Sequence, residues 1–292
     1  MTTPPPAPAR PAATVVVLRP APDAPFQVLL VRRNDQVAFM AGAYVFPGGR
    51  VDDSDAPEPA GACDGLDTMG RFADLTALDE ARHRVAAIRE LLEEAGVLLA
   101  RDDAGVMADA ATAAAIRRAL PPPASLVELL AARGLRPALD AVMPFAHWVT
   151  PEIEIRRYDT RFLLARMPAA QEASHDAGEM TALEWLTPQQ AVDRCHRGEM
   201  MLPPPTWTTL KRLGRFASID EAWQWASATP MVRIQPGFVR AGTSATIVLP
   251  GDPTYPLPLG CEPPDDTRFE LVEGRGWRPV PASPPESGSG DD

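Results

Sequence analysis

The sequence contains a single lysine, Lys211, only three cysteines, and no apolar run as long as the roughly 18 residues that a membrane-spanning helix requires. A transmembrane helix is therefore not expected. Residues 1–12 also lack the apolar segment of a signal peptide. The cysteines, Cys63, Cys195 and Cys261, are far apart, and no CxxC spacing occurs. A reducing compartment is thus favoured over a disulfide framework, and nothing indicates a cysteine metal site.

Acidic residues outnumber basic ones, 39 to 28, which gives a formal charge of −11. This charge argues against general affinity for nucleic acid or anionic membranes, although a local basic patch would still bind phosphates. A composition of 45% hydrophobic and 23% charged residues is typical of a soluble globular protein. The abundance of Ala, Pro and Arg and the lack of a C-terminal SKL signal favour a bacterial cytosol, so a cytoplasmic protein is expected.

Hydrophobic patterning predicts an α+β fold whose elements alternate too irregularly for a doubly wound parallel sheet. Strands are expected at 14–20, 26–33, 43–46, 138–150, 158–167 and 181–186. Helices are expected at 78–95, 108–120, 124–134, 187–198, 204–216 and 218–226. The main domain is placed at 13–228, between a disordered lead at 1–12 and a C-terminal extension with short strands at 229–280. A disordered tail is expected at 281–292.

The helix from about Leu78 to Ala95 is the best supported, because Thr76 and Asp79 have capping-box spacing and Gly96 fits a C-terminal cap. One face of this helix is apolar, and the opposite face of its last two turns carries three glutamates.

These glutamates, Glu90, Glu93 and Glu94, stand at i, i+3 and i+4. Like charges at this spacing repel by about 0.2–0.5 kcal/mol per pair, and the helix dipole disfavours anions near a C-terminus. A solvated face is the ordinary interpretation of such acids. A bound cation would relieve both penalties, and carboxylates are the ligands that Mg²⁺ and Mn²⁺ prefer. Arg89 can pair with Glu93 one turn later and hold that carboxylate in place.

The segment RELLEEAGV, residues 89–97, follows FPGG, residues 46–49, in the order of a known motif. Together they resemble the box of the Nudix hydrolases, whose second half reads R-E-U-x-E-E-x-G-U with U aliphatic. The resemblance implies an α/β/α sandwich with a mixed central sheet. It also implies Mg²⁺- or Mn²⁺-dependent hydrolysis of a nucleoside diphosphate linked to another group.

The box is interrupted. The family places a glutamate six residues after the second glycine and eight before the arginine, but eight before Arg89 stands Ala81. About 26 residues are therefore inserted, at about 50–75, and Glu80 is one step out of register. Whether Glu80 replaces the missing glutamate is left open. The acids of RVDDSD, 50–55, are expected to begin the insertion without acting as ligands, and the insertion is a candidate cover for the substrate.

An interrupted box resembles the type-19 group of coenzyme A diphosphatases. VLLVRRNDQVAFMAGAYVFPGG, 28–49, keeps the spacing of that group's upstream signature at Leu29, Leu30, Arg33, Gly42 and 46–49. It departs from the signature at Val31, Asn34 and Ala38. The resemblance covers about 12–226 and implies hydrolysis of the pyrophosphate of CoA or acyl-CoA. The alternatives are ADP-ribose or a nucleotide sugar as substrate, or a non-catalytic Nudix-fold module that binds a nucleotide.

The resemblance also implies a role for individual residues. The expected metal ligands are the carbonyl of Gly49 and the side chains of Glu90, Glu93 and Glu94. The expected catalytic residues are Glu90, Glu93, Arg89 as the orienting residue, and Glu179 as a base or additional ligand. The expected contacts to substrate are Arg32, Arg33 and Gly48. Weaker candidates are Arg156, Arg157 and Arg161, whereas Tyr158 and Phe162 are expected in the core.

The expected partner is a small-molecule nucleoside diphosphate derivative, with neither nucleic acid nor a membrane. The C-terminal extension is expected to be either an added small β element or a dimerisation arm, so a homodimer is one of two alternatives.

Overall fold

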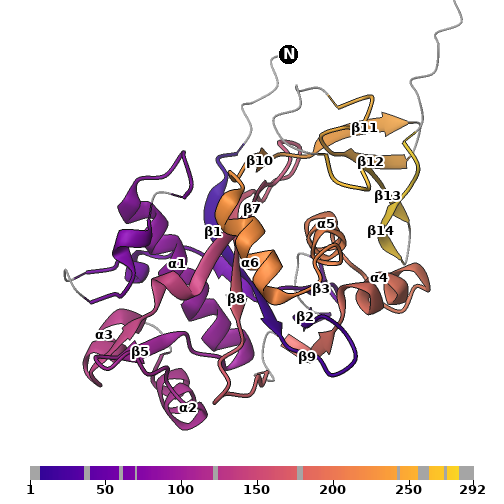
Figure 1. The fold of residues 1–292 in the computed structure, drawn as a ribbon. Coiled ribbons are helices and arrows are strands. Elements are labelled where there is room, and N and C mark those ends of the chain that lie inside the picture. Colours follow the sequence, from indigo (N-terminus) through magenta and orange to yellow (C-terminus); the bar gives the residue numbers. More distant parts are fainter. Residues whose placement is uncertain are drawn as a thin grey trace, which may run out of the picture.

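The computed structural model describes residues 7–35, 40–58, 62–69, 71–120, 124–175, 180–241, 244–255, 263–272 and 275–282. A mixed sheet forms its centre, with the strand order β10-β7-β8-β1-β2-β3, while β4 pairs with β1 and β9 with β2 (Figure 1). The strands are β1 (Arg10–Arg19), β2 (Gln27–Arg33), β3 (Tyr44–Val45), β4 (Gly48–Arg50), β7 (Val142–Val149), β8 (Tyr158–Arg166), β9 (Met180–Leu186) and β10 (Arg233–Ile234). The pairs β1–β8 and β7–β10 are parallel, and the other pairs are antiparallel.

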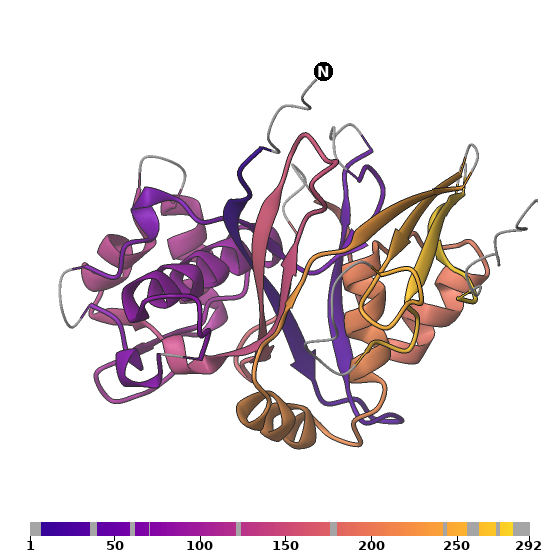
Figure 2. The same cartoon turned by 90° about the horizontal axis from the view of Figure 1, so that it is seen from above.

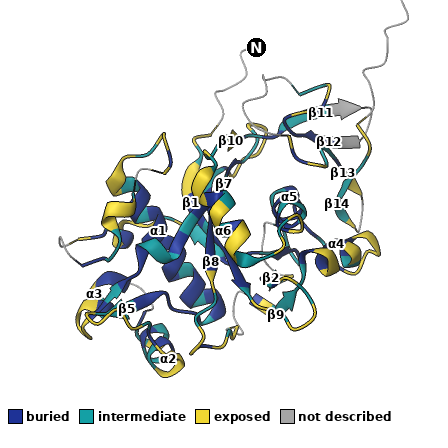
Figure 3. Ribbon diagram, viewed as in Figure 1, coloured by how far each residue is buried: buried dark blue, intermediate teal, exposed yellow. Residues whose placement is uncertain are grey.

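Both faces of the sheet are covered by helices, as the alternation along β1 requires. Val15 and Val17 belong to one buried cluster, whereas Val16 and Leu18 belong to the other. The first cluster includes residues of α1 (Ala77–Ala95), α2 (Ala110–Ala119) and α3 (Leu126–Ala131). The second includes residues of α4 (Pro188–His196), α5 (Pro204–Leu213) and α6 (Ile219–Ala228). Figure 2 shows these helices on either side of the sheet, and Figure 3 shows that most of β1, β7 and β8 is buried. The expected α/β/α sandwich is confirmed.

Helix α1 begins and ends where its capping residues predict. The Thr76 side chain accepts a hydrogen bond from the backbone N–H of Asp79 at 3.1 Å. Gly96 ends the helix with a φ of 66°, a left-handed conformation that glycine adopts without strain. The three glutamates therefore lie in the last two turns, as expected.

The inserted segment packs on α1 instead of forming a long open loop. It contains two short 3₁₀ turns, η1 (Asp53–Asp55) and η2 (Leu66–Thr68). Cys63 and Phe72 are buried in the cluster that contains the apolar face of α1. Beyond α1, β5 (Ala100–Asp102) and β6 (Leu135–Pro137) form a small ladder on the same side of the molecule. The insertion thus enlarges the core around α1.

A separate sheet lies in the C-terminal extension, in the order β11-β12-β13-β14, whereas β10 of the extension joins the central sheet (Figure 1). The strands of the separate sheet are β11 (Gly237–Ala241), β12 (Ser244–Val248), β13 (Arg268–Val272) and β14 (Gly276–Pro279). Leu249 and Phe269 are fully buried in the cluster that includes α5. The Trp207 indole of α5 donates to Asp266 at 2.7 Å. The extension is therefore anchored to the sandwich, and we call its sheet the C-terminal sheet.

Two boundaries differ from the sequence expectation. Strand β1 begins at Arg10, inside the segment expected to be disordered, because residues 10–12 pair with β8 and β4 reaches Ala12 from the other side. Strand β7 begins only at Val142, because a 3₁₀ turn, η3 (Leu139–Ala141), precedes it. No helix in the described ranges is long and apolar enough to cross a membrane.

Candidate active site

The FPGG turn and the end of α1 are in direct contact. The backbone N–H of Gly48 donates to a carboxylate oxygen of Glu94 at 2.9 Å. A Cβ atom on Gly49 would lie only 2.3 Å from Glu90 Oε1, so any larger residue would displace that carboxylate. A Cβ on Gly48 would meet the carbonyl oxygen of Ala13 at 2.5 Å. The two glycines are therefore needed to bring β4 against both β1 and the glutamate face of α1.

The Arg89 side chain connects the parts of this site, because each of its N–H groups donates a hydrogen bond within it. Its NH1 group donates to Glu90 at 2.8 Å and to Glu93 at 3.0 Å. Its Nε and NH2 groups donate to the two oxygens of Asp55 at 2.8 and 3.0 Å. NH2 also donates to the carbonyl oxygen of Arg50 at 2.9 Å. A guanidinium has five N–H donors, and each is used here, which confirms the pairing with Glu93 and fixes both glutamates.

Asp55 corrects the sequence interpretation of the interrupted box. It stands six residues after Gly49, at the position where the family places a glutamate, and it is fully buried against Arg89. The carboxylate is therefore present, and the inserted residues follow it instead of preceding it. Counting forward from Gly49 would have found Asp55, whereas counting back from Arg89 across the insertion led to Ala81.

Glu80 does not replace the box glutamate. Its buried carboxylate pairs with Arg84 at 2.5 Å and accepts the backbone N–H groups of Arg71 and Phe72. Glu80 thus fastens the end of the insertion to α1. The proposed role of the insertion as a cover stays a prediction: Arg50 and Asp52, which precede Asp55, line the cavity, whereas none of the described residues from 56 to 75 does.

The environment of Glu90 favours a neutral carboxyl group or a bound cation. Burial raises the pKa of Glu90 to about 7, the charge of Arg89 opposes this rise, and the nearby Glu93 carboxylate adds to it. A divalent cation would stabilise the ionised form and would suit these oxygen donors. Within the described part of the chain, no three Asp, Glu, His or Cys side chains converge on one point as a formed metal site. The Glu90 and Glu93 carboxylates instead accept hydrogen bonds from Arg89, and the Glu94 carboxylate accepts one from Gly48.

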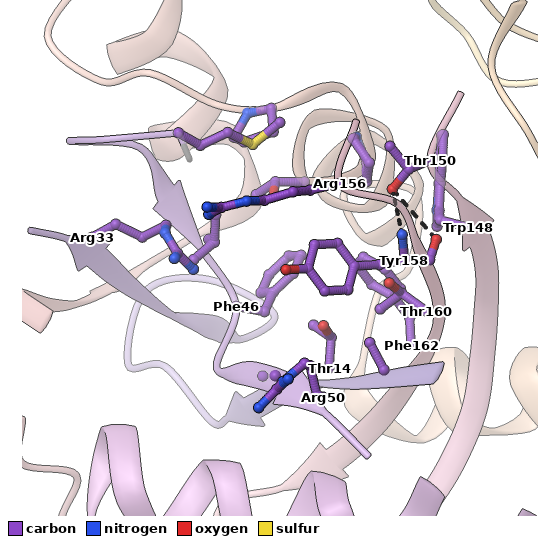
Figure 4. A pocket seen from close by; sticks show the side chains of 18 of the residues that line it. Thr14, Arg33, Phe46, Arg50, Trp148, Thr150, Arg156, Tyr158, Thr160 and Phe162 are labelled. Atoms are coloured by element: carbon purple, nitrogen blue, oxygen red, sulfur yellow. Dashed lines mark hydrogen bonds between the residues drawn. The ribbon is translucent and has the colours of Figure 1, made fainter. Parts of the chain in front are cut away.

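A cavity of about 820 Å³ opens beside these groups (Figure 4). Gly48, Gly49 and the three glutamates form one part of its lining. The guanidinium side chains that line it are Arg33, Arg50 and Arg156, and its aromatic lining includes Phe46, Trp148, Tyr158 and Phe162. The cavity therefore joins a carboxylate rim, cationic groups and an apolar surface.

The arginines expected to meet substrate separate into two groups. Arg33 lines the cavity, and its buried Nε has no hydrogen-bond partner. The neighbouring Arg32 instead forms an ion pair with Asp35 at 2.8 Å and is not part of the lining. Arg156 lines the cavity, whereas Arg161 is buried and donates to Asp74 and to His147 Nδ1. Arg33 and Arg156 are thus the candidates that the geometry favours.

Alternate residues of β8 face the cavity, and the sequence interpretation assigned none of them to the site. Tyr158, Thr160 and Phe162 line the cavity, although Tyr158 and Phe162 were expected in the core. Phe162 is indeed buried, in an edge-to-face contact with Phe46 at 6.3 Å between ring centres. The period-two pattern of the strand was the signal that would have placed all three on one face. Glu179 lies outside the described residues, so its proposed role stays a prediction.

A second, smaller recess adjoins the cavity. It has a volume of about 400 Å³ and shares Arg50, Arg156 and Tyr158 with the cavity. Arg10 and Arg157 also line it. We call it the arginine recess. Arg157 donates to the carbonyl oxygens of Thr150 and Ala7, which leaves Arg10, Arg50 and Arg156 as its exposed cations.

Comparison with known proteins agrees with this geometry. The family model of the NUDT19 Nudix domain matches residues 67–213, a range that includes α1 and its three glutamates. The chain belongs to this family of Nudix hydrolases. The chicken (Gallus gallus) protein named acyl-coenzyme A diphosphatase NUDT19 is 30% identical over 85% of this chain and 77% of its own length. The human protein of the same name is 27% identical over 84% of this chain and 76% of its own length.

A solved structure supports the assignment of the fold. The crystal structure of a Nudix hydrolase from Alicyclobacillus acidocaldarius superposes with a TM-score of 0.64 and 29% identity, and the match covers 77% of this chain and 98% of that one. The Nudix resemblance of RELLEEAGV is thus confirmed. FPGG and Asp55 precede the matched range 67–213. They contact residues within that range, because Gly48 donates to Glu94 and Arg89 donates to Asp55.

Proposed function

We propose that this Nudix hydrolase cleaves the pyrophosphate of CoA or acyl-CoA. Water adds across the P–O–P linkage, and the products are 3′-phosphoadenosine 5′-phosphate and 4′-phosphopantetheine or its acyl derivative. The observation that carries the proposal is the cavity in which the three glutamates of α1 and three arginines share one lining. Such a lining suits a polyanionic substrate that arrives with a cation. The names of the NUDT19 relatives support acyl-CoA as the substrate.

Nudix hydrolases generally use divalent metals, and the donor set of this site fits Mg²⁺ or Mn²⁺. Glu90, Glu93, Glu94 and the Gly49 carbonyl would hold the ion, and Arg89 would keep the first two carboxylates in place. When bound, the ion neutralises the pyrophosphate and lowers the pKa of the attacking water. Arg33 would donate to a phosphate oxygen, and its buried Nε without a hydrogen-bond partner supports this role. Glu179 remains the proposed base.

The arginine recess favours CoA over ADP-ribose or a nucleotide sugar. CoA carries a 3′-phosphate in addition to its pyrophosphate, and a second anion needs a second cationic site. Arg50 and Arg156 line both the cavity and the recess, so one substrate can contact both. Guanidinium groups are well suited to phosphate because they donate in a planar fork. This matters in a chain whose only lysine, Lys211, lies in α5 outside both linings.

The test is a substrate panel. Purified protein with Mg²⁺ is offered CoA, an acyl-CoA, ADP-ribose and NADH, and the phosphorylated products are quantified by chromatography. We expect CoA and acyl-CoA to be cleaved most efficiently. Cleavage of ADP-ribose without cleavage of CoA would refute the substrate assignment. Binding of nucleotides without any turnover would instead favour a non-catalytic nucleotide-binding module. The oligomeric state is read from the same preparation by light scattering, since a homodimer stays a prediction.

A further inference from the structure

The C-terminal sheet contributes directly to the cavity. Ile247 of β12 and Trp277 of β14 line it, together with Pro236 just before β11. All three residues lie outside the range 67–213 that the family model matches. On the rest of the apolar lining, Trp148 and Phe162 belong to β7 and β8 of the central sheet, and Phe46 lies between β3 and β4. The apolar part of the cavity is thus built jointly by the sandwich and the extension.

The residues of the C-terminal sheet alternate so that one face is apolar. Ile247 is paired across the strands with Phe269, and Leu271 is paired with Trp277. Residues that are paired in this way lie on the same face, as do residues two apart in one strand. Phe269 is fully buried and Ile247 is 8% exposed, whereas Leu271 is 52% exposed at the end of the face. The solvent exposure of Trp277 is intermediate between those of Phe269 and Leu271, and its side chain lines the cavity.

Several contacts anchor the C-terminal sheet to the sandwich in this position. Arg278, next to Trp277, donates to the carbonyl oxygen of Cys195 and contacts its Sγ at 3.0 Å. A Cβ on Gly276 would lie 2.3 Å from the Met201 sulfur, so β14 packs closely on the Met201 side chain. Arg215 forms an ion pair with Asp265, next to the Trp207–Asp266 hydrogen bond. The apolar wall is therefore preformed.

We propose that Trp277 and Ile247 form the binding wall for the acyl-pantetheine arm of the substrate. This inference rests on the proposed cleavage of acyl-CoA and assigns a part of the substrate to a part of the cavity. The nucleotide end of acyl-CoA is charged and suits the glutamates and arginines. The acyl chain is apolar, and contact with an apolar wall stabilises it in proportion to the apolar area removed from water, so a longer chain gains more. The C-terminal sheet thereby sets acyl-chain preference.

The experiment compares Trp277→Ala and Ile247→Ala with the matched control Leu271→Ala, which removes an apolar side chain from the same face but outside the cavity lining. kcat/KM is measured for free CoA, acetyl-CoA and decanoyl-CoA. In the unmodified enzyme we expect kcat/KM to rise with chain length. Trp277→Ala should lower kcat/KM for decanoyl-CoA about tenfold more than for free CoA, and Leu271→Ala should leave this ratio unchanged. Trp277→Leu serves if the alanine variant does not fold, with a smaller loss in the same direction.

A second readout does not depend on turnover. Binding of decanoyl-CoA and of CoA is measured calorimetrically in EDTA, and Trp277→Ala should abolish the advantage of the acyl chain. The assignment of the wall would be overturned if Trp277→Ala lowered the affinity or kcat/KM equally for CoA and decanoyl-CoA. It would also be overturned if Trp277→Ala and Leu271→Ala had equal effects. Either result would leave the proposed function intact. Failure of the unmodified enzyme to cleave any CoA compound would overturn the proposed function, and chain-independent binding would then overturn the wall as well.

Discussion

Asp55 and Arg89 form a buried, two-bonded ion pair across 34 positions of sequence, with Nε–Oδ1 and NH2–Oδ2 distances of 2.8 and 3.0 Å. The pair closes the interrupted box. It places the start of the insertion beside α1, and it fixes the arginine that orients Glu90 and Glu93. The geometry of the candidate site therefore depends on a residue that lies before the inserted segment.

Replacement of Asp55 by alanine should impair both stability and activity. Removing one partner of a buried ion pair leaves the other charge uncompensated, which typically costs about 3–5 kcal/mol. The exposed neighbour Asp53, which pairs with Arg82 at 3.2 Å, provides the control, because surface ion pairs contribute about 0–1 kcal/mol. Urea unfolding and kcat for CoA are measured for Asp55→Ala and Asp53→Ala. Equal stabilities of the two variants would contradict the role of the Asp55–Arg89 pair.

Metal affinity should depend on pH through Glu90. With a pKa of about 7 in the absence of metal, this carboxyl holds a proton at pH 6 that a cation must displace. The affinity for Mn²⁺ should therefore be about tenfold lower at pH 6 than at pH 8, as measured by electron paramagnetic resonance. Glu90→Gln should bind more weakly with a flatter pH profile. A pH-independent affinity in the unmodified protein would refute this account of Glu90.

The same raised pKa has a consequence for stability without metal. Glu90 has a higher pKa in the folded chain than its ordinary value of 4.5, so its contribution to stability is complete below about pH 4.5 and is lost as the pH rises to about 7. Above pH 7, metal-free Glu90→Gln should unfold at a higher temperature than the unmodified protein. An unchanged or lower melting temperature at pH 8 in EDTA would show that the ionised carboxylate is not destabilising.

Arg156 should distinguish CoA from 3′-dephospho-CoA. Arg156 lines both the cavity and the arginine recess, and within the described ranges it forms no ion pair. A hydrogen bond to a charged group contributes about 1.5–3 kcal/mol, so Arg156→Gln should lower kcat/KM for CoA by about 10- to 100-fold. The effect on 3′-dephospho-CoA should be small. Arg133→Gln, an exposed substitution just after α3 and outside both linings, is the control, and equal losses on both substrates would place Arg156 at the pyrophosphate instead.

The fold was largely predictable because its signals are local. The apolar run of β1 and the caps of α1 each act within a few residues, and both elements form there, although β1 begins earlier than expected. The contact between FPGG and the glutamates was also predicted, through the motif. Arg32 and Arg33 show the limit of such signals. Neighbouring strand residues point to opposite faces, and only the packed structure decides which of the two meets the cavity.

Contacts across long sequence separations account for what the sequence did not predict. Asp55 was missed because the insertion breaks the register between the two halves of the box. The wall formed by Ile247 and Trp277 was missed because it depends on how the C-terminal sheet packs on α5 and on Met201. No pattern within residues 229–280 encodes that position on its own.

The most direct test of the account is the steady-state hydrolysis of CoA by Glu93→Gln in Mg²⁺. Glu93 is hydrogen-bonded to Arg89 at 3.0 Å, and its side chain is 37% exposed, so the substitution should leave the fold and melting temperature almost unchanged. Because the glutamates are proposed to hold the catalytic ion, kcat should fall by about 10²-fold or more. The exposed Glu128→Gln in α3 should retain full activity. Unchanged kcat in a folded Glu93→Gln variant would mean that the glycine turn and the end of α1 are not the metal site.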